Sequence, residues 1–384
     1  MILGAITTAQ LVLCEVTTPQ ELEEFIRFPW EIYKNDPLWV PPLVPMQRDF
    51  LSREKGPFFE FGEAIYYLAR RDGRVVGRIS AHVNHLYEQH HDNETGFFGF
   101  FECEDNQDTA NALFEAAAAW VKARGKIKIH GPLSFAIYDE VGLLVSGFDT
   151  APCMMHTHNP QYYEKLVLNW GFTKTYDWYA YRVLRNPNMD VARMRKMRDA
   201  ILARNNCRIL PIERRDFARR GAEIKQLFND IWSKNWGHVP LTDRQFKDIF
   251  VTLQPLVRPD LESMILEDDR IVAFSVVSPD MNIPVKRFNG KFGLWQKLQL
   301  LYECRVKPLT HCRAIIMGVA RSHQWKRLHH AIILNIFVNF LEKHPTIESC
   351  DCSLIPESLE QWNKTLMDFG AERYKVFRLY DREV

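Results

Sequence analysis

Residues 160–183 read PQYYEKLVLNWGFTKTYDWYAYRV. Asn159 and Pro160 are typical of a helix start, and Gly171 is typical of a helix end. The residues after Gly171 are rich in aromatic and β-branched side chains, so a strand follows directly. This stretch therefore predicts a helix–strand corner that closes a unit in which strands and helices alternate.

A second corner of the same kind occurs near the C-terminus. Residues 358–380 read SLEQWNKTLMDFGAERYKVFRLY, and Gly370 takes the place of Gly171. Each corner is preceded by a hairpin signal, Asp72-Gly73 in the first half and Asp268-Asp269-Arg270 in the second. In both halves the expected order is hairpin, strand, helix, strand, helix, strand. We infer an internal duplication.

The expected elements divide the chain into two domains. In the first half we expect strands at 11–16, 64–71, 74–83, 96–103, 127–129 and 172–183, and helices at 19–34, 108–124 and 160–170. In the second half we expect strands at 207–212, 261–267, 271–278, 312–319, 347–353 and 372–380, and helices at 216–234, 242–253, 324–343 and 358–369. The predicted domains are therefore 1–184 and 207–384, joined by a linker helix within 185–206.

The junction between the two halves is basic. Residues 182–220 hold twelve Arg and Lys against four Asp and Glu. We interpret this segment as a solvated connecting helix. The alternative is a basic strip that faces the phosphates of a cofactor or a membrane.

The composition limits the possible functions. The chain has 384 residues, 46% of them hydrophobic, and a net charge of +1, which is typical of a globular protein without a general attraction for nucleic acid. Its eight cysteines show no zinc-like spacing, and His82, His85, His90 and His91 have no carboxylate or thiol at a matching spacing, so we expect no metal. The segment Met1–Thr8 lacks a basic leader, and the apolar runs are shorter than the ~18–20 residues that span a bilayer. We expect a cytoplasmic protein, with peripheral contact at the inner face of the membrane as a further option.

Several long aromatic strings resemble one family. The strand–helix order is that of the GNAT acyltransferase fold, and the chain is similar to the YghO-like family of bacterial tandem GNAT-fold proteins at residues 28–42, 77–81, 96–102, 147–149, 159–163 and 235–240. The resemblance implies an α/β fold with two tandem GNAT-like (acyl-CoA N-acyltransferase) domains, each with a mixed central sheet flanked by helices. Relatives are assigned as bacterial ceramide synthases, which implies transfer of an acyl group from acyl-CoA to a long-chain amino alcohol.

The resemblance also implies a place for the acyl-CoA or acetyl-CoA co-substrate. GNAT enzymes bind the CoA pyrophosphate where a central strand runs into a helix N-terminus, with the pattern Gln/Arg-x-x-Gly-x-Gly/Ala. The matching stretch here runs from Val319 to His329. Gln324 fits the first position of the pattern, whereas Arg327 and His329 stand where glycines are expected. The positive charge would come from Arg321, Lys326, Arg327 and His329.

The corresponding stretch of the first half, residues 102–109, is acidic and would repel phosphate. If one half binds CoA, we therefore expect it to be the second. The alternative is that neither half binds CoA and that the basic helix start is only solvated.

Three polar residues are candidates for catalysis. Glu102 ends an apolar run, and burial there would raise its pKa to suit a general base. His158 precedes a helix and is either a base or a neighbour of the helix cap. Asp280 follows a buried strand and either binds a substrate hydroxyl or amine or forms a turn. The Tyr that acts as an acid in GNAT enzymes is replaced here by Val167 and Leu366.

Residues 291–310 interleave Trp and Leu with Lys and Arg. Such a segment can lie on a bilayer, wall an acyl-chain channel or pack as a lid. Together with this segment, the resemblance implies an N-acyltransferase that acts on a primary amine, in particular a long-chain amine. The alternatives are acetyl transfer to a small amine and a catalytically inactive tandem-GNAT scaffold. Acyl-chain length, acceptor identity, oligomeric state and which half is catalytic stay open.

Overall fold

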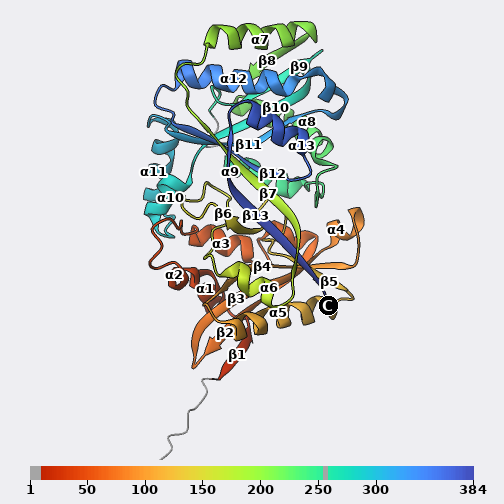
Figure 1. The fold of residues 1–384 in the computed structure, drawn as a ribbon, viewed down its shortest axis with the longest axis vertical. Helices are drawn as coiled ribbons and strands as arrows, with labels where there is room; N and C mark the ends of the chain where they lie inside the picture. Colours follow the sequence, from red (N-terminus) through yellow and green to blue (C-terminus); the bar gives the residue numbers. More distant parts are fainter. Residues whose placement is uncertain (1–9, 254–257) are drawn as a thin grey trace, which may run out of the picture. The chain divides into compact units, whose positions relative to one another are not determined.

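A computed structural model describes residues 10–253 and 258–384, so the segment Met1–Thr8 lies outside the described residues. The chain forms two compact units (Figure 1). Unit 1 ends at Asp177 and also includes Phe377–Val384, and unit 2 consists of Trp178–Val376. The structural division thus falls a few residues before position 184, and the last residues of the chain lie with the first half.

Unit 1 is built on a sheet with the strand order β1-β2-β3-β4-β5-β13. Its strands are β1 (Leu11–Glu15), β2 (Gly62–Arg71), β3 (Arg74–Asn84), β4 (Thr95–Cys103), β5 (Lys128–Gly131) and the end of β13 (Glu372–Glu383), with the short β6 (Leu143–Ser146) in addition. Its helices are α1 (Pro19–Arg27), α2 (Pro29–Ile32), α3 (Val44–Leu51), η1 (Pro57–Glu60), α4 (His85–His90), α5 (Gln107–Lys122) and α6 (Tyr163–Asn169). Helix α5 buries Leu113, Phe114 and Val121 against strands β2–β4.

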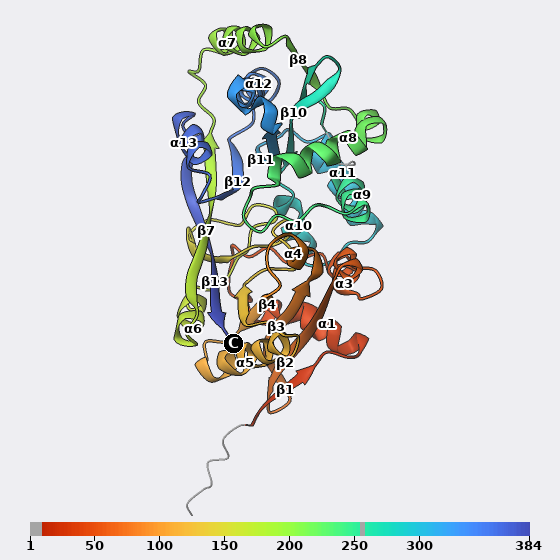
Figure 2. The ribbon, with the colours of Figure 1, turned by 90° about the vertical axis from the view of Figure 1, so that its right-hand side faces the viewer.

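Unit 2 has the strand order β7-β12-β11-β10-β9-β8. Its strands are β7 (Thr173–Leu184, from Trp178 on), β8 (Cys207–Pro211), β9 (Ser263–Glu267), β10 (Arg270–Pro279), β11 (His311–Val319) and β12 (Ser349–Pro356). Its helices are α7 (Val191–Arg204), α8 (Arg214–Trp232), α9 (Asp243–Leu253), α10 (Asn282–Phe288), α11 (Leu294–Arg305), η3 (Arg321–Lys326), α12 (Leu328–Lys343) and α13 (Glu360–Asp368). The helix expected as a linker is α7, which lies along α12 and buries Leu202 (Figure 2).

In the described part of each unit, a parallel strand pair is joined only over its first residues. Strand β4 pairs with β5 from Thr95↔Lys128 to Phe97↔His130, and β11 pairs with β12 from His311↔Ser349 to Ala314↔Cys352. Beyond these residues the strands of each pair have no further ladder between them. In β4 the backbone takes a positive φ of 49° at Phe100, where the register with β3 also shifts. The shifted register sets Glu102 opposite Arg78.

The closing strands are exchanged between the two halves of the sequence. Strand β7, from the first half, pairs with β12 in unit 2, from Trp178↔Pro356 to Leu184↔Ser349. Strand β13, from the second half, pairs with β5 in unit 1, from Tyr380↔Gly131 to Glu383↔Lys128. The duplication of the element order is confirmed, but each half therefore completes the sheet of the other unit.

Three expected helices differ from the structure. The helix expected at 160–170 begins only at Tyr163, and Asn159 Oδ1 accepts the Leu144 N–H at 2.7 Å instead of capping the helix. The helix expected at 19–34 breaks, because Pro29 has no N–H to continue the ladder, so α1 ends at Arg27 and α2 begins at Pro29. The helix expected at 324–343 begins only at Leu328, because Arg327 has a left-handed φ of 57°. Within residues 10–253 and 258–384, no helix combines the length and the apolar character needed to cross a bilayer.

Candidate active site

A buried carboxylate in unit 1 is held by two tyrosines. Glu102 lies near the end of β4, and only 12% of its side chain is exposed. Its Oε2 accepts a hydrogen bond from the Tyr163 hydroxyl at 2.7 Å and lies 2.8 Å from the Tyr33 hydroxyl, which also donates. The Cys103 N–H donates to the Tyr163 oxygen at 2.8 Å, which leaves the Tyr163 proton to Glu102. The carboxylate thus has a fixed position and two neutral donors.

Burial and charge set the protonation of this group. Burial raises the pKa of Glu102 above its usual value of 4.5, and this rise is opposed by Arg78 and by the two tyrosine hydrogen bonds. The Arg78 Nη2 lies 3.6 Å from Glu102 Oε1. Burial, with the charge of Glu102, raises the pKa of Tyr33 and Tyr163 well above the usual range, so both hydroxyls stay protonated. Glu102 is therefore the group of this set that can accept a proton.

His158 belongs to the same cluster. Its Nε2 lies 2.7 Å from Asp36 Oδ2, and its main-chain oxygen lies 2.9 Å from the Tyr33 hydroxyl. Burial raises the pKa of Asp36. The hydrogen bonds from His158 and from the Leu38 N–H outweigh this rise, so the pKa lies below its usual value. The Asp36 carboxylate therefore stays charged and orients the imidazole, as in other carboxylate–histidine pairs. Tyr33 connects this pair to Glu102.

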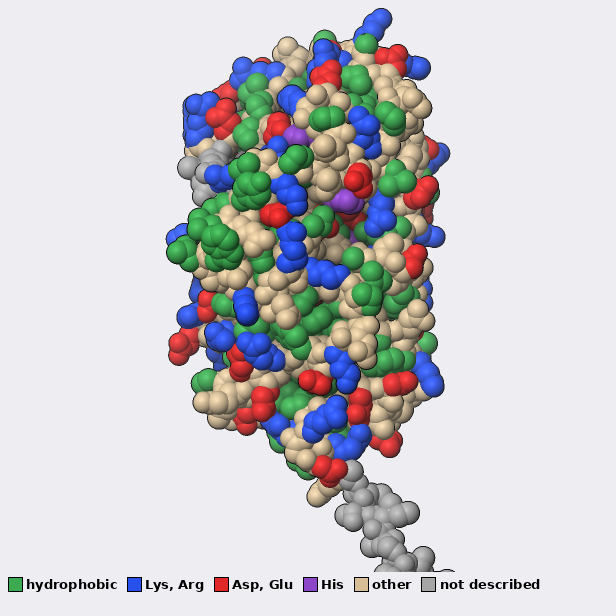
Figure 3. Space-filling view, turned by 90° about the vertical axis from the view of Figure 1, so that its left-hand side faces the viewer, with side chains coloured by type: hydrophobic (Ala, Val, Ile, Leu, Met, Phe, Trp, Pro, Cys, Tyr) green, Lys and Arg blue, Asp and Glu red, His purple; other side chains and the backbone are tan. Residues whose placement is uncertain are grey.

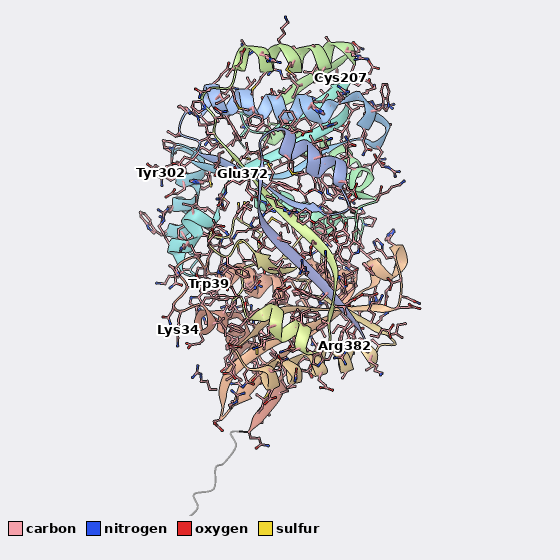
Figure 4. The ribbon with its side chains drawn as sticks, in the orientation of Figure 1. Lys34, Trp39, Cys207, Tyr302, Glu372 and Arg382 are labelled. Carbon is pink, nitrogen blue, oxygen red and sulfur yellow. The ribbon has the colours of Figure 1, made fainter. Side chains whose placement is uncertain are left out.

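The segment after α2 places Tyr33 and Asp36. Tyr33 is the C-cap residue that follows α2, and Asp36 accepts the Leu38 N–H at 2.8 Å, which turns the chain. Trp39, which is labelled in Figure 4, lies in the same segment. Its ring stacks on that of Tyr33, with ring centroids 4.9 Å apart. Contacts among residues 33–39 therefore hold this turn in place.

Sequence reasoning found part of this cluster. Glu102 and His158 were predicted, and the structure brings them together around Tyr33. Tyr33, Asp36, Arg78 and Tyr163 were not among the predicted site residues. The string at 28–42, which carries part of the family resemblance, contains both Tyr33 and Asp36, and was the signal that could have pointed to them.

Asp280 is not part of this cluster. It lies in unit 2, where it follows β10, and its Oδ1 accepts the Asn282 N–H at 3.0 Å as α10 begins. This geometry fits the turn-forming alternative that the sequence left open.

The predicted CoA segment lies between β11 and α12 in unit 2. Val319 ends β11, Arg321 and Gln324 lie in the turn η3, and Arg327 precedes the first residue of α12. Arg327 has the left-handed conformation that glycine adopts most easily, so the backbone keeps a glycine-like turn although the residue is Arg. The strand therefore runs into the helix through a left-handed residue that is Arg and not Gly.

The charges of this segment are partly neutralised. Lys326 and His323 both contact Glu267, the histidine at 2.8 Å. Arg321 contacts Ser233 at 3.3 Å, and its side chain and that of Arg327 are exposed. Burial lowers the pKa of His329 to about 4, so this ring is neutral near pH 7 and adds no charge. Arg321 and Arg327 remain the cations best suited to an anion.

The corresponding helix start in unit 1 is occupied by the chain itself. Asn106 caps α5 by accepting the Thr109 N–H at 3.0 Å. Glu104 contacts Arg71 and accepts a hydrogen bond from the Thr109 hydroxyl at 3.1 Å. These carboxylate and amide oxygens would repel a phosphate at this helix start.

Similarity to known proteins extends over nearly the whole chain. No family model matches it. The chain is 32% identical over 366 residues to Protein YghO of Escherichia coli, which covers 95% of this chain and 93% of that protein. The chain belongs to the YghO-like family. Another relative, the Bacterial ceramide synthase of Caulobacter vibrioides, is 29% identical over 379 residues, covering 98% of each protein.

Solved structures show the fold of this YghO-like protein. A tandem GNAT protein from the clavulanic acid biosynthesis pathway matches with a TM-score of 0.56 at 10% identity, over 97% of this chain and 98% of that one. A GCN5-related N-acetyltransferase from Sphaerobacter thermophilus matches with a TM-score of 0.51 at 10% identity, over 97% and 95% of the two chains. The α/β fold with two tandem GNAT-like domains is thereby confirmed.

Proposed function

We propose that this YghO-like protein is an acyl-CoA-dependent N-acyltransferase whose acceptor is a long-chain amine, with unit 1 as the site of proton transfer. The observation that carries the proposal is the buried Glu102 carboxylate between Tyr33 and Tyr163, beside the Asp36–His158 pair. The long-chain acceptor is supported by the full-length similarity to a protein named a bacterial ceramide synthase. The partner is then a membrane that holds such amines.

The proposed reaction is direct attack on the thioester. The neutral amine forms a C–N bond to the acyl carbon, and the carbonyl oxygen becomes an oxyanion. When the C–S bond breaks, CoA leaves as a thiolate, and the nitrogen loses one proton. The carbonyl re-forms as the C–S bond breaks. Glu102 accepts the proton from nitrogen, His158 donates one proton to the CoA thiolate, and proton exchange with solvent restores both side chains. Tyr33, between the two groups, keeps both in place.

We place the CoA pyrophosphate at the turn between β11 and α12. The features that support this are the backbone N–H groups at the start of α12, the glycine-like turn at Arg327 and the exposed Arg321 and Arg327. Lys326 contributes less, because Glu267 already neutralises it. Acyl-CoA enters as a co-substrate and supplies the activated carbonyl.

The test is a product assay with purified full-length protein. Mass spectrometry should detect an N-acylated product and free CoA in equal amounts when palmitoyl-CoA and sphinganine are supplied. Acetyl-CoA with a small polyamine tests the alternative substrate class. Greater turnover with acetyl-CoA would replace the long-chain proposal by a small-amine acetyltransferase, and no turnover of either pair would leave the inactive scaffold.

A further inference from the structure

One helix of unit 2 exposes apolar side chains along its length. The α11 face consists of Leu294, Trp295, Leu298, Tyr302 and Val306, which are 75%, 73%, 51%, 56% and 66% exposed. Their spacings of three, four and seven residues place them on one side of the helix. Tyr302 marks this helix in Figure 4, and Figure 3 looks at the same side of the molecule, where hydrophobic side chains lie among Lys and Arg.

The opposite side of α11 attaches the helix to unit 2. Cys304 is buried there and lies 3.3 Å from the Met281 sulfur, next to α10. Glu303 also anchors the helix through contacts with Arg287 and Lys307. The α11 face is therefore not needed to hold the helix in place, and burial in the protein does not explain its Trp, Leu and Tyr side chains.

Cations surround the α11 face. Lys291, Lys297 and Arg305 are exposed on or next to α11. In the described part of the chain no ion pair joins Lys291 or Lys297 to a carboxylate, and Lys297 lies 5.5 Å from the centre of the Phe292 ring. Trp and Tyr prefer the interface of a bilayer, and nearby Lys and Arg are attracted to anionic lipid headgroups. This combination is typical of a helix that lies in the plane of a membrane surface.

We propose that the α11 face docks this protein on an anionic membrane surface. The inference rests on the proposed function, because a long-chain amine is held in a bilayer rather than in water. A second copy of the chain fits the face less well. In a symmetric pair the same surface meets itself, so Lys291 and Lys297 of both copies would gather in one apolar interface.

The test is co-sedimentation of the full-length protein with vesicles. Binding is expected to vesicles of phosphatidylcholine with phosphatidylglycerol, and to be weaker with phosphatidylcholine alone. Trp295→Ser with Leu298→Ser should weaken binding by at least about tenfold, since two apolar side chains leave the interface. Lys291→Ser with Lys297→Ser should remove most of the preference for the anionic vesicles.

Matched variants carry the same changes elsewhere in unit 2. Met197→Ser with Met367→Ser removes two exposed apolar side chains, and Lys196→Ser with Lys343→Ser removes two exposed lysines. Both should bind vesicles as the unchanged protein does. Equal loss in the matched pair, or no binding by the unchanged protein, would overturn the proposal. So would a dimer in light scattering that Trp295→Ser with Leu298→Ser dissociates while vesicle binding persists.

A second measurement separates this inference from the proposed function. Turnover is measured with detergent-solubilised sphinganine, where no vesicle is present. If turnover persists and vesicle binding fails, the α11 proposal is wrong and the acyltransferase stands. If vesicle binding depends on the α11 face but no amine is acylated, the proposed function is wrong and the docking surface stands.

Discussion

At the scale of single residues, the candidate site depends on the groups that contact Glu102. Two neutral phenols and one guanidinium meet this carboxylate in a place from which water is largely excluded. The phenols hold the carboxylate in position, and burial makes it a better proton acceptor than a solvated Glu. Residue type alone indicated a buried acid at the end of a strand. The partners could not be predicted, because Tyr33 and Tyr163 lie far from Glu102 in sequence.

The first prediction concerns Glu102→Gln. The amide oxygen can still accept from the tyrosines, but it cannot take a proton from the amine. We expect kcat to fall by about 10²-fold or more with little change in KM. In the unchanged protein the raised pKa of Glu102 should place the rising limb of the pH–rate profile above pH 4.5, and this limb should vanish in the variant.

The matched control is Glu104→Gln, which removes a carboxylate two residues further along that contacts Arg71 instead. It should leave kcat within about threefold of the unchanged protein. If the two variants lose activity equally, Glu102 is a structural residue and the base lies elsewhere. His158→Gln then becomes the next variant to measure.

The second prediction concerns a buried imidazole away from this site. His82 on β3 is fully buried against Phe58, Phe97 and Phe135, and burial lowers its pKa from 6.5 to about 3. The unfolded chain therefore binds more protons than the folded chain between these values, so stability falls as the pH falls below 6.5. His82→Leu should abolish about 2 kcal/mol of the stability lost between pH 7 and pH 5.

Urea unfolding at the two pH values measures this effect. His90→Leu, at an exposed position of α4, is the control and should show the same acid-induced loss as the unchanged protein. If His82→Leu loses as much stability between pH 7 and pH 5 as the unchanged protein, other groups dominate the acid sensitivity of unit 1.

At the scale of elements, the helix that follows the central strand begins differently in the two units. In unit 1 the start of α5 is capped by Asn106 and surrounded by carboxylates, whereas the start of α12 has no side-chain cap and is preceded by Arg327. The sequence showed this contrast, because it depends on which charges are close in the chain. It did not show that Glu267 pairs with Lys326, because that contact joins β9 to η3.

The third prediction tests the helix start of unit 2. Lys326→Glu with Arg327→Glu should abolish CoA binding, since two anions would face the pyrophosphate. Arg327→Gly separates charge from backbone strain, because Gly tolerates the left-handed φ of 57° at this position. We expect it to weaken CoA binding by about tenfold without lowering Tm. Calorimetry gives the affinity, and differential scanning gives Tm.

Gln107→Lys is the control at the start of α5. The carboxylates around it already repel phosphate, so an added lysine should barely change the affinity for CoA. Unchanged affinity in the double variant would remove the β11–α12 turn from consideration. A gain of affinity in Gln107→Lys would move the CoA site to unit 1.

At the scale of the whole molecule, the order of elements was predictable and the pairing of the last strands was not. Hairpin turns, helix stops and alternating apolar residues are local signals, and they gave the duplication correctly. The exchange of β7 and β13 is a choice between two similar strands at two similar sheet edges. No local signal distinguishes these edges, so two independent domains with boundaries at 184 and 207 were the simplest expectation.

The last prediction follows from this exchange. Phe377, Leu379 and Tyr380 are fully buried, and Arg378 pairs with Asp177 at 2.8 Å, all within unit 1. Burial of three such side chains contributes roughly 5–9 kcal/mol, which is comparable to the whole stability of a typical domain. A chain that ends at Val376, or one that ends at Leu184, should therefore fail to form unit 1.

Hydrogen exchange of amides in β3–β5 measures this directly. In the chain ending at Val376 the protection of these amides should be lost, while that of α12 in unit 2 should persist. Leu379→Ala should destabilise unit 1 by about 2–5 kcal/mol, and Met367→Ala, at an exposed position of α13, should have almost no effect. If residues 1–184 alone unfold cooperatively at the temperature of the full chain, β13 is dispensable and the first half is an independent domain.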